Sequence, residues 1–149
     1  MLALVPAHNE QAVIGETIAS LQRQTCRPDR IVVVLDDCSD ATAIVAVAMG
    51  VETFATRDNR DRKAGALNQA LDHYLPGLRA GDSVLVVDAD TTLSPDFIEV
   101  ALRHAGPGVG RVGGASKGDQ PGRYSATCSG GSTSGTDGRS SGKASVPSC

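Results

Sequence analysis

Short apolar runs alternate with stretches of helical periodicity along the first hundred residues. Four runs have the length and the valine or leucine content of buried strands, and they cover residues 2–5, 31–35, 51–54 and 84–87, the third being the weakest. Elsewhere apolar residues recur every three to four positions, which predicts helices over residues 10–24, 41–49, 64–75 and 94–104. The order βαβαβαβα predicts an α/β fold with a parallel sheet and helices on both of its faces.

Polar clusters follow three of the four expected strands. They are residues 8–10 (HNE), 36–37 (DD) and 88–90 (DAD). Because the carboxyl ends of parallel strands lie at one edge of a sheet, and ligands of such sheets bind there, these clusters are expected to share one site.

The cluster after the fourth strand carries the clearest chemistry. Residues one apart on an extended backbone point the same way, so Asp88 and Asp90 are expected to converge. Two neighbouring carboxylates repel each other, and a hard divalent cation such as Mg²⁺ or Mn²⁺ relieves that repulsion. Taken alone, the Asp-x-Asp pattern is better explained by an aspartate that caps a loop.

The other two clusters leave alternatives open. Asp36 and Asp37 are adjacent, so at most one of them faces a shared site unless the strand has ended. Asp37 is the better candidate for binding a base or a ribose, and a turn or a helix cap explains it equally well. His8 is expected to be a loop histidine, and Asn9 is as well suited to cap the first helix as to bind a ligand.

Composition divides the chain near residue 105. Residues 106–149 contain no Leu, Ile, Phe or Met and hold 12 of the 17 glycines. Such a segment buries too little apolar surface to offset the entropy of ordering it. We therefore expect a folded part over residues 1–105 and a Gly/Ser-rich, disordered tail over residues 106–149.

Charge and cysteine usage narrow the classes of protein further. The net charge of −3 gives no general attraction to nucleic acid, although basic residues gather at positions 57–63. The four cysteines lack metal-ligand spacing, which favours unpaired thiols in a reduced, cytoplasmic protein. No apolar stretch approaches the ~18 residues that a membrane span needs, and no signal peptide is expected.

Several familiar sites are excluded by their missing motifs. No Gly-rich fingerprint follows the first strand, and no Walker loop is present. A phosphoacceptor receiver domain needs its acid pair after the first strand, whereas the pairs here follow the second and fourth. What remains is an acid pair suited to a metal, with a basic loop suited to phosphate or, alternatively, simply solvated.

Four segments in order resemble the family 2 glycosyltransferases, which are inverting enzymes with the GT-A fold. They are VPAHNE (5–10), IVVVLDDCSDAT (31–42), KAGALNQAL (63–71) and DAD (88–90). The third is similar to the branch that makes polysaccharides such as cellulose, chitin and hyaluronan. The resemblance implies a nucleotide-diphospho-sugar donor, most simply a UDP-sugar, a glycan acceptor and Mg²⁺ or Mn²⁺.

The resemblance also implies roles for individual positions. The nucleotide pocket would be lined by Pro6, Ala7 and Glu10, and Asp37 would contact the base. Near the base and phosphates would lie Lys63, with Arg60 or Arg62. Asp88 would hold the ribose or a metal-bound water, and Asp90 would bind the metal directly.

The resemblance covers the donor half of the family and then stops. Gly110–Gly114 is similar to the start of the family's next Gly-rich region, but no segment matches the acidic base or the later tryptophan motif, and the chain has no Trp. The sequence therefore predicts a glycosyltransferase core that is truncated, or whose reading frame shifts near residue 111. A fragment that binds nucleotide and metal without catalysis is the alternative.

Overall fold

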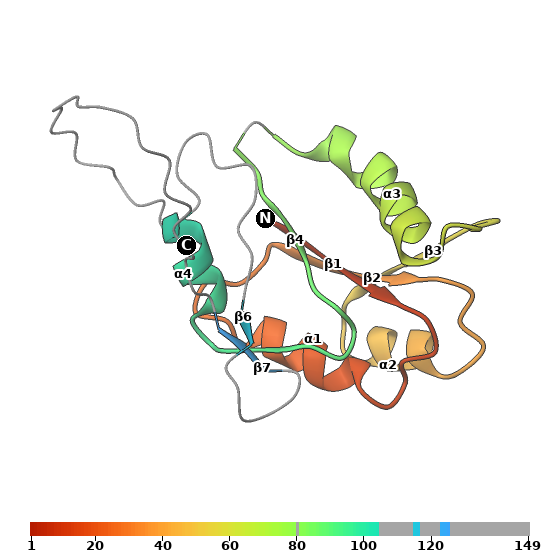
Figure 1. Cartoon of the computed structure of the whole chain (residues 1–149), viewed down its shortest axis with the longest axis horizontal. Helices are drawn as coiled ribbons and strands as arrows, with labels where there is room; N and C mark the ends of the chain where they lie inside the picture. Colours follow the sequence, from red (N-terminus) through yellow and green to blue (C-terminus); the bar gives the residue numbers. More distant parts are fainter. Residues whose placement is uncertain (80, 105–114, 117–122, 126–149) are drawn as a thin grey trace, which may run out of the picture.

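A four-stranded parallel sheet forms the centre of the computed structural model, which describes residues 1–79, 81–104, 115–116 and 123–125. Helices cover both faces of this sheet, with α3 on one face and α1 and α2 on the other (Figure 1). The α/β class predicted from the sequence is confirmed. The sheet strands are β1 (Leu2–Ala7), β2 (Arg30–Leu35), β3 (Glu52–Ala55) and β4 (Val84–Val86), and the helices are α1 (Ile14–Gln22), α2 (Thr42–Ala48), α3 (Arg62–Tyr74) and α4 (Phe97–His104).

The strand order β3-β2-β1-β4 places the first strand inside the sheet. The chain builds outward from β1 to β3 and then crosses back to add β4 on the other side of β1. Pairing runs from Leu2 opposite Arg30 to Ala7 opposite Leu35, and from Leu2 opposite Val84 to Leu4 opposite Val86. Such a reversal of strand order opens a crevice at the carboxyl ends of the strands, which is where open α/β sheets bind ligands.

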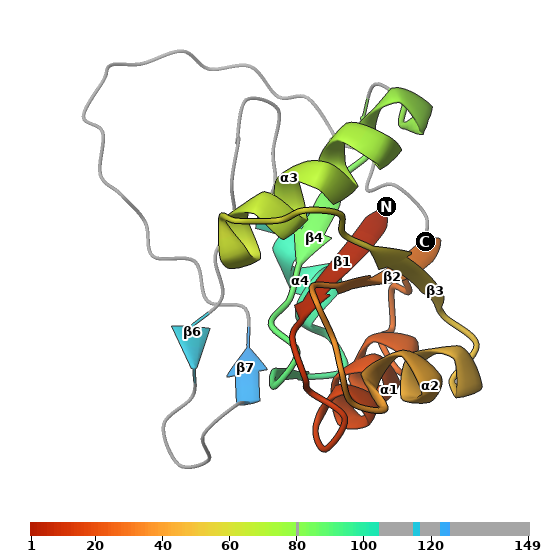
Figure 2. The ribbon, with the colours of Figure 1, turned by 90° about the vertical axis from the view of Figure 1, so that its right-hand side faces the viewer.

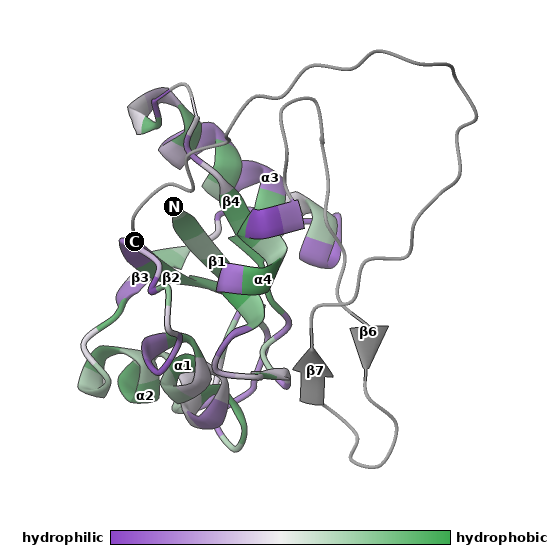
Figure 3. Ribbon diagram, turned by 90° about the vertical axis from the view of Figure 1, so that its left-hand side faces the viewer, coloured by the Kyte–Doolittle hydropathy of each residue, from purple (hydrophilic) through white to green (hydrophobic). Residues whose placement is uncertain are grey.

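Alternation along β1 feeds two hydrophobic cores. Ala3 and Val5 pack toward α1, α2 and α4, whereas Leu2 and Leu4 pack under α3. Every residue of β1 is buried, as expected for a parallel strand covered on both faces. Figure 2 shows the two helical layers edge-on, and Figure 3 shows the hydrophobic colouring of the strands between them.

The structure moves some boundaries and adds one feature. Helix α1 begins at Ile14 instead of residue 10, because the N–H groups of Val13 and Ile14 both bond the carbonyl of Glu10 in a turn. A second sheet of order β5-β7-β6 was not predicted, and it joins β5 (Thr92–Leu93) to β6 (Ala115–Ser116) and β7 (Arg123–Ser125). The other residues expected in the tail lie outside the described ones, so its disorder stays a prediction. A 3-10 turn, η1 (Leu75–Gly77), closes α3.

The cysteines behave differently from one another. Cys38 is a half-buried free thiol, as expected, whereas Cys26 is disulfide-bonded, so the prediction of unpaired thiols is wrong for this residue. Among the helices of the described part, none is long and apolar enough to cross a bilayer.

An ion pair at the amino ends of β2 and β3 gives a prediction of acid sensitivity. Arg30 donates to both carboxylate oxygens of Glu52 at 2.8 and 2.7 Å, and its guanidinium lies 4.8 Å from the centre of the Tyr74 ring. These hydrogen bonds hold the pKa of Glu52 below its usual value. The pair therefore stabilises the fold above the ordinary glutamate pKa of about 4.3, and this contribution is lost as pH falls through the lowered value.

Because both side chains are about half exposed, we expect Glu52→Gln to cost about 0.5 kcal/mol at pH 7. The cost should be smaller at pH 3 than at pH 7. Urea unfolding of both proteins at the two pH values measures it. Equal costs at both would show that the charge of Glu52 is not what stabilises this corner.

Candidate functional site

A pocket of about 640 Å³ lies at the carboxyl ends of β1, β2 and β4. It is closed on a third side by the first turn of α3. All eight residues predicted for the site line it, and they are Pro6, Ala7, Glu10, Asp37, Arg60, Lys63, Asp88 and Asp90. The topology thus brings together residues that lie more than eighty positions apart in the chain, although their individual roles remain predictions.

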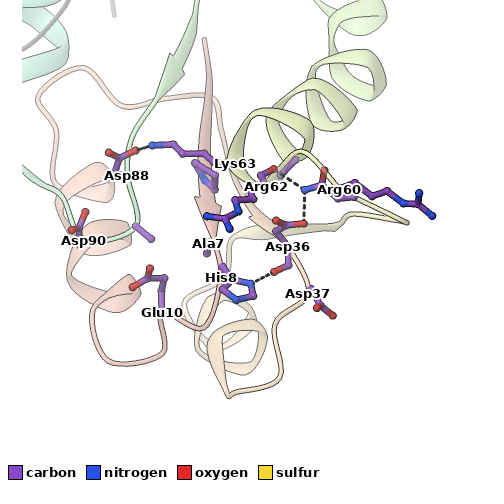
Figure 4. Close-up of a pocket in the computed structure, with 14 residues that line it drawn as sticks. Ala7, His8, Glu10, Asp36, Asp37, Arg60, Arg62, Lys63, Asp88 and Asp90 are labelled. Atoms are coloured by element: carbon purple, nitrogen blue, oxygen red, sulfur yellow. Dashed lines mark hydrogen bonds and ion pairs between the residues drawn. The ribbon is translucent and has the colours of Figure 1, made fainter.

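The acid pair after β4 is presented to this pocket by the backbone. Asp88 and Asp90 are exposed, whereas Ala89 between them is 5% exposed and packs in the core. A turn closes immediately, because the N–H of Thr91 donates to the carbonyl of Asp88 at 3.0 Å. Figure 4 shows both carboxylates on the same side of the pocket, with Glu10 beside Asp90.

Lys63 crosses the pocket to the acid pair. Its ammonium forms an ion pair with Asp88, and both side chains are about half exposed (Figure 4). Lys63 lies in the first turn of α3, whose N-terminus has no side-chain cap. Unbonded N–H groups at a helix start attract anions, so Lys63 and this helix end together favour a phosphate-sized anion.

Hydrogen bonds join the loop after β1 to the loop after β2. The Oδ1 of Asn9 accepts hydrogen bonds from the N–H groups of Ser39 and Asp40, at 2.8 and 3.3 Å, so Asn9 caps this turn and not the first helix. In return, Asp40 accepts from the N–H of Gln11, and Thr42 accepts from the N–H of Glu10 at 2.8 Å. These bonds fix Glu10 against the start of α2.

Asp40 also has the role expected of a helix-start residue. Its Oδ1 accepts from the N–H of Thr42, the first residue of α2, at 3.0 Å. Partial burial opposes ionisation of this carboxyl, but hydrogen bonds from Thr42 and Gln11 outweigh it and lower the pKa of Asp40. The loops are therefore locked by a carboxylate that is ionised at neutral pH.

The two acids after β2 both line the pocket, because the strand ends at Leu35, before them. Asp36 is held in place, since its Oδ1 accepts from Thr56 at 2.8 Å and from the amide of Asn59 at 2.7 Å. Asp37 is exposed. The carbonyl of Asp36 lies 2.6 Å from Nδ1 of His8, which places the histidine ring in the pocket wall.

Backbone strain collects around this pocket. Asn9, Asp37, Asp58 and Arg62 have φ between +47° and +57°, and they are the non-glycine residues of the described part with positive φ. Such conformations cost about 1–3 kcal/mol each and persist where the surroundings impose them. Such clustering is typical of functional loops, and this observation does not depend on the sequence motifs.

The two arginines of the basic loop, Arg60 and Arg62, point in different directions. Arg60 and Arg62 are both exposed and both line the pocket. Figure 4 shows Arg62 turned toward the pocket between Lys63 and His8, whereas Arg60 extends away from the acid pair. Of the two arginines left open by the sequence, Arg62 is therefore better placed to reach a phosphate.

The donor set suits a divalent cation that also binds a ligand. Among the described residues, no group of three or more His, Cys, Asp or Glu side chains forms a complete metal cage. Asp88 and Asp90 supply two exposed carboxylates beside a cationic helix end. Mg²⁺ and Mn²⁺ are commonly bound by one or two carboxylates with phosphate oxygens and water, so the residues fit such an ion.

Sequence reasoning missed the residue that organises the basic loop. Asn59 donates to Asp36 and to the carbonyl of Arg62, both at 2.7 Å, and accepts from the N–H of Asp61. A Cβ on Gly65 would lie 2.0 Å from the Oδ1 of Asn59. The only signal in the sequence was a glycine in the first turns of an otherwise strong helix, KAGALNQAL, where glycine needs a packing reason.

This contact predicts that Gly65→Ala weakens both the basic loop and ligand binding. Alanine gains about 1 kcal/mol of helix propensity over glycine but displaces Asn59, whose three hydrogen bonds are worth about 1 kcal/mol each. We expect the free energy of unfolding to fall by up to about 2 kcal/mol, and binding of the UDP that the family resemblance implies to weaken by about three- to tenfold, measured by urea unfolding and calorimetry.

Gly15→Ala is the matched control, because a Cβ there meets only ordinary contacts at 3.7 Å. It should stabilise α1 and leave UDP binding unchanged. Equal binding losses in the two variants would contradict the role given to Gly65.

Comparison with known proteins agrees with this geometry. The parallel sheet with its helices matches the GT-A fold of the nucleotide-diphospho-sugar transferases. The family described as "Glycosyl transferase family 2" matches residues 3–125. The chain belongs to this glycosyltransferase family.

The relatives are longer than this chain. "Putative glycosyltransferase EpsH" of Bacillus subtilis (strain 168) is 32% identical over 106 residues, which are 69% of this chain and 29% of the relative. "Probable glucomannan 4-beta-mannosyltransferase 15" of Arabidopsis thaliana is 30% identical over 113 residues, 68% of this chain and 21% of the relative. The chain therefore spans less than a third of either protein.

A solved structure with the same fold is glucosyl-3-phosphoglycerate synthase from Mycobacterium tuberculosis, determined in complex with Mn²⁺, UDP and phosphoglyceric acid. The TM-score is 0.56 at 24% identity, over 72% of this chain and 40% of that one. A second crystal structure of the same enzyme, with UDP, is 25% identical with the same TM-score and coverage.

Proposed function

We propose that this chain is the donor-binding part of a glycosyltransferase that transfers a sugar from a nucleoside diphosphate to an acceptor with inversion. The observation that carries the proposal is the pocket itself. Carboxylates enter it from β4, cations enter it from α3, and the loops of β1 and β2 form its floor. Opposed charges at this edge suit a ligand that is anionic, bridged to a metal, and attached to a neutral base and sugar.

The base and ribose belong on the β1 and β2 side. Pro6, Ala7 and Glu10 line this side, and the N–H of Glu10 donates to the hydroxyl of Thr42 in α2. Asp37 is an exposed acceptor for the N–H of a base. The phosphates belong at the N-terminus of α3, where Lys63 and Arg62 supply cationic donors. The uracil base of a UDP-sugar is the proposed partner, in keeping with the UDP bound by the mycobacterial synthase.

Asp90, together with Asp88, is proposed to hold Mg²⁺ or Mn²⁺. Such an ion, when bound, neutralises charge on the departing diphosphate. The residues of the chain do the rest. The α3 N-terminus and Lys63 orient the diphosphate, and the loops of β1 and β2 hold the nucleoside, so that the anomeric carbon is presented toward the acceptor side.

The acceptor is proposed to be a growing polysaccharide or a cell-envelope glycan, as the names of the glucomannan relatives suggest. We expect the acceptor groups and the general base outside residues 1–104, and a cytoplasmic location where nucleotide sugars are supplied. The second candidate is binding of nucleotide and metal without turnover. It needs only the pocket that the described residues form.

Calorimetric titration of the chain with UDP, in Mn²⁺ and then in EDTA, tests the shared part of both candidates. We expect saturable binding in Mn²⁺ that weakens at least tenfold in EDTA. Absence of metal-dependent binding to UDP and to the other nucleoside diphosphates would overturn both. Release of UDP from a UDP-sugar in the presence of a glycan acceptor then separates an enzyme from a binding module.

A further inference from the structure

A buried polar stripe runs along the inner face of α1. Thr17 is 1% exposed, Ser20 is 2% exposed, and Gln24, two residues beyond the helix, is 3% exposed. They lie at spacings of three and four, so they share one side of the helix with the core residues around them. Three buried polar side chains in succession are costly unless each is hydrogen-bonded.

All three bond the backbone of the segment that follows β4. Thr17 donates to the carbonyl of Ala89 at 2.6 Å. Ser20 accepts from the N–H of Leu93 at 3.2 Å. Gln24 donates to the carbonyl of Ser94 at 2.6 Å and accepts from the N–H of Ile98 at 3.0 Å.

The segment needs these partners because it leaves the main sheet early. β4 ends at Val86, and the last ladder-like bond to β1 joins the N–H of Val87 to the carbonyl of Leu4. Some of the residues that follow are buried, namely Ala89, Thr91 and Leu93. Buried backbone groups that have left the main sheet must find other partners, and side chains of α1 supply partners for Ala89, Leu93 and Ser94.

The first of these bonds falls between the two acids of the pocket. Ala89 is the residue between Asp88 and Asp90, and the hydroxyl of Thr17 donates a buried hydrogen bond to the carbonyl of Ala89. With that peptide anchored inward and the side chain of Ala89 also buried, the side chains on either side face the pocket. The turn from Asp88 to Thr91 is thereby fixed from behind.

We propose that Thr17 is a positioning residue for the Asp88 and Asp90 carboxylates, with Ser20 and Gln24 extending the same support along the segment. Thr17 does not line the pocket. It acts by setting the direction in which the two acids leave the backbone. The metal-binding consequence rests on the proposed function, whereas the positioning of the turn does not.

The test replaces the Thr17 hydroxyl by a methyl group in Thr17→Val and restores it in Thr17→Ser. Gln22→Leu is the matched control, because Gln22 also lies on α1 and bonds a backbone carbonyl, that of Met49, away from the pocket. The first readout is hydrogen exchange of the Thr91 amide in the full chain without ligand. The second is Mn²⁺ binding in the presence of UDP, followed by electron paramagnetic resonance.

We expect Thr17→Val to speed Thr91 exchange and weaken Mn²⁺ binding, each by about three- to tenfold, as for one lost buried hydrogen bond. Thr17→Ser should restore both values, and Gln22→Leu should change neither. Should Thr17→Val not fold, Ser20→Ala serves in its place, with faster exchange at Leu93 and a smaller loss of Mn²⁺ affinity.

Two results overturn the inference. The first is that the Thr91 amide exchanges at the same rate in Thr17→Val as in the parent. The second is that Gln22→Leu speeds Thr91 exchange and weakens Mn²⁺ binding as much as Thr17→Val does, which would indicate general destabilisation. If Thr91 exchange responds as expected while the parent binds no Mn²⁺ with UDP, the positioning of the turn stands and the proposed function falls.

Discussion

Asp90→Ala is expected to remove metal-dependent nucleotide binding. Asp90 is exposed at the pocket and is the proposed direct ligand. Loss of residues that merely support metal ligands weakens metal binding by about 10–100-fold, so loss of a ligand from a two-carboxylate set should cost at least about a hundredfold. That ratio corresponds to about 2.7 kcal/mol. Calorimetric titration of UDP in Mn²⁺ measures it, and affinity in EDTA should stay at the low value of the parent.

The fold should tolerate this change, because the Asp90 side chain has no hydrogen bond or ion pair among the described residues. Asp72→Ala removes an exposed carboxylate from α3 outside the pocket and serves as the control, with UDP binding unchanged. UDP affinity in Mn²⁺ that survives Asp90→Ala would assign the metal to other residues.

The sheet was predictable because its strands are continuous runs of apolar residues, which are typical of parallel strands buried on both faces. Residues 31–35 (IVVVL) leave little choice but a strand buried on both faces, and β2 occupies 30–35. The site followed from topology, since three polar clusters at strand ends must meet once the strands are parallel and adjacent. Family motifs added roles that geometry alone does not assign.

What escaped prediction depends on contacts between distant segments. Thr17 and Ser20 look like ordinary polar positions of an amphipathic helix, and only the path of the chain after β4 shows that they face inward. Asn59 lies in a mostly charged loop, and nothing in the sequence shows that its side chain bonds Asp36 and Arg62. The pairing of β5 with β7 depends on residues whose composition gave no strand signal.

The structure adds a second positive charge to the acid pair. The repulsion between Asp88 and Asp90 was expected to be relieved by a divalent cation, and the structure also places the ammonium of Lys63 on Asp88. The protein thus carries its own cation at the acid pair. The same ammonium is proposed to bind phosphate, so Lys63 is shared between two partners, and metal and nucleotide binding should be coupled through it.

Lys63→Met tests this coupling through two changes of opposite sign. Removing the ammonium frees Asp88, and because an exposed ion pair is worth about 0.2–1 kcal/mol, Mn²⁺ binding without nucleotide should strengthen by up to about fivefold. The phosphates lose a charge-assisted hydrogen bond of about 1.5–3 kcal/mol, so UDP binding in Mn²⁺ should weaken by about 10–100-fold.

Electron paramagnetic resonance of Mn²⁺ measures the first quantity, and calorimetry with UDP measures the second. Arg79→Met removes an exposed cation beyond the end of α3 and should move neither quantity, which controls for the loss of one positive charge. If Mn²⁺ alone bound more weakly to Lys63→Met, the ammonium would be supporting Asp88 in its metal-binding position rather than competing for it. The two opposite shifts together would show that Lys63 pairs with Asp88 in the free protein and with the diphosphate when UDP is bound, which would leave Asp88 available to a metal ion.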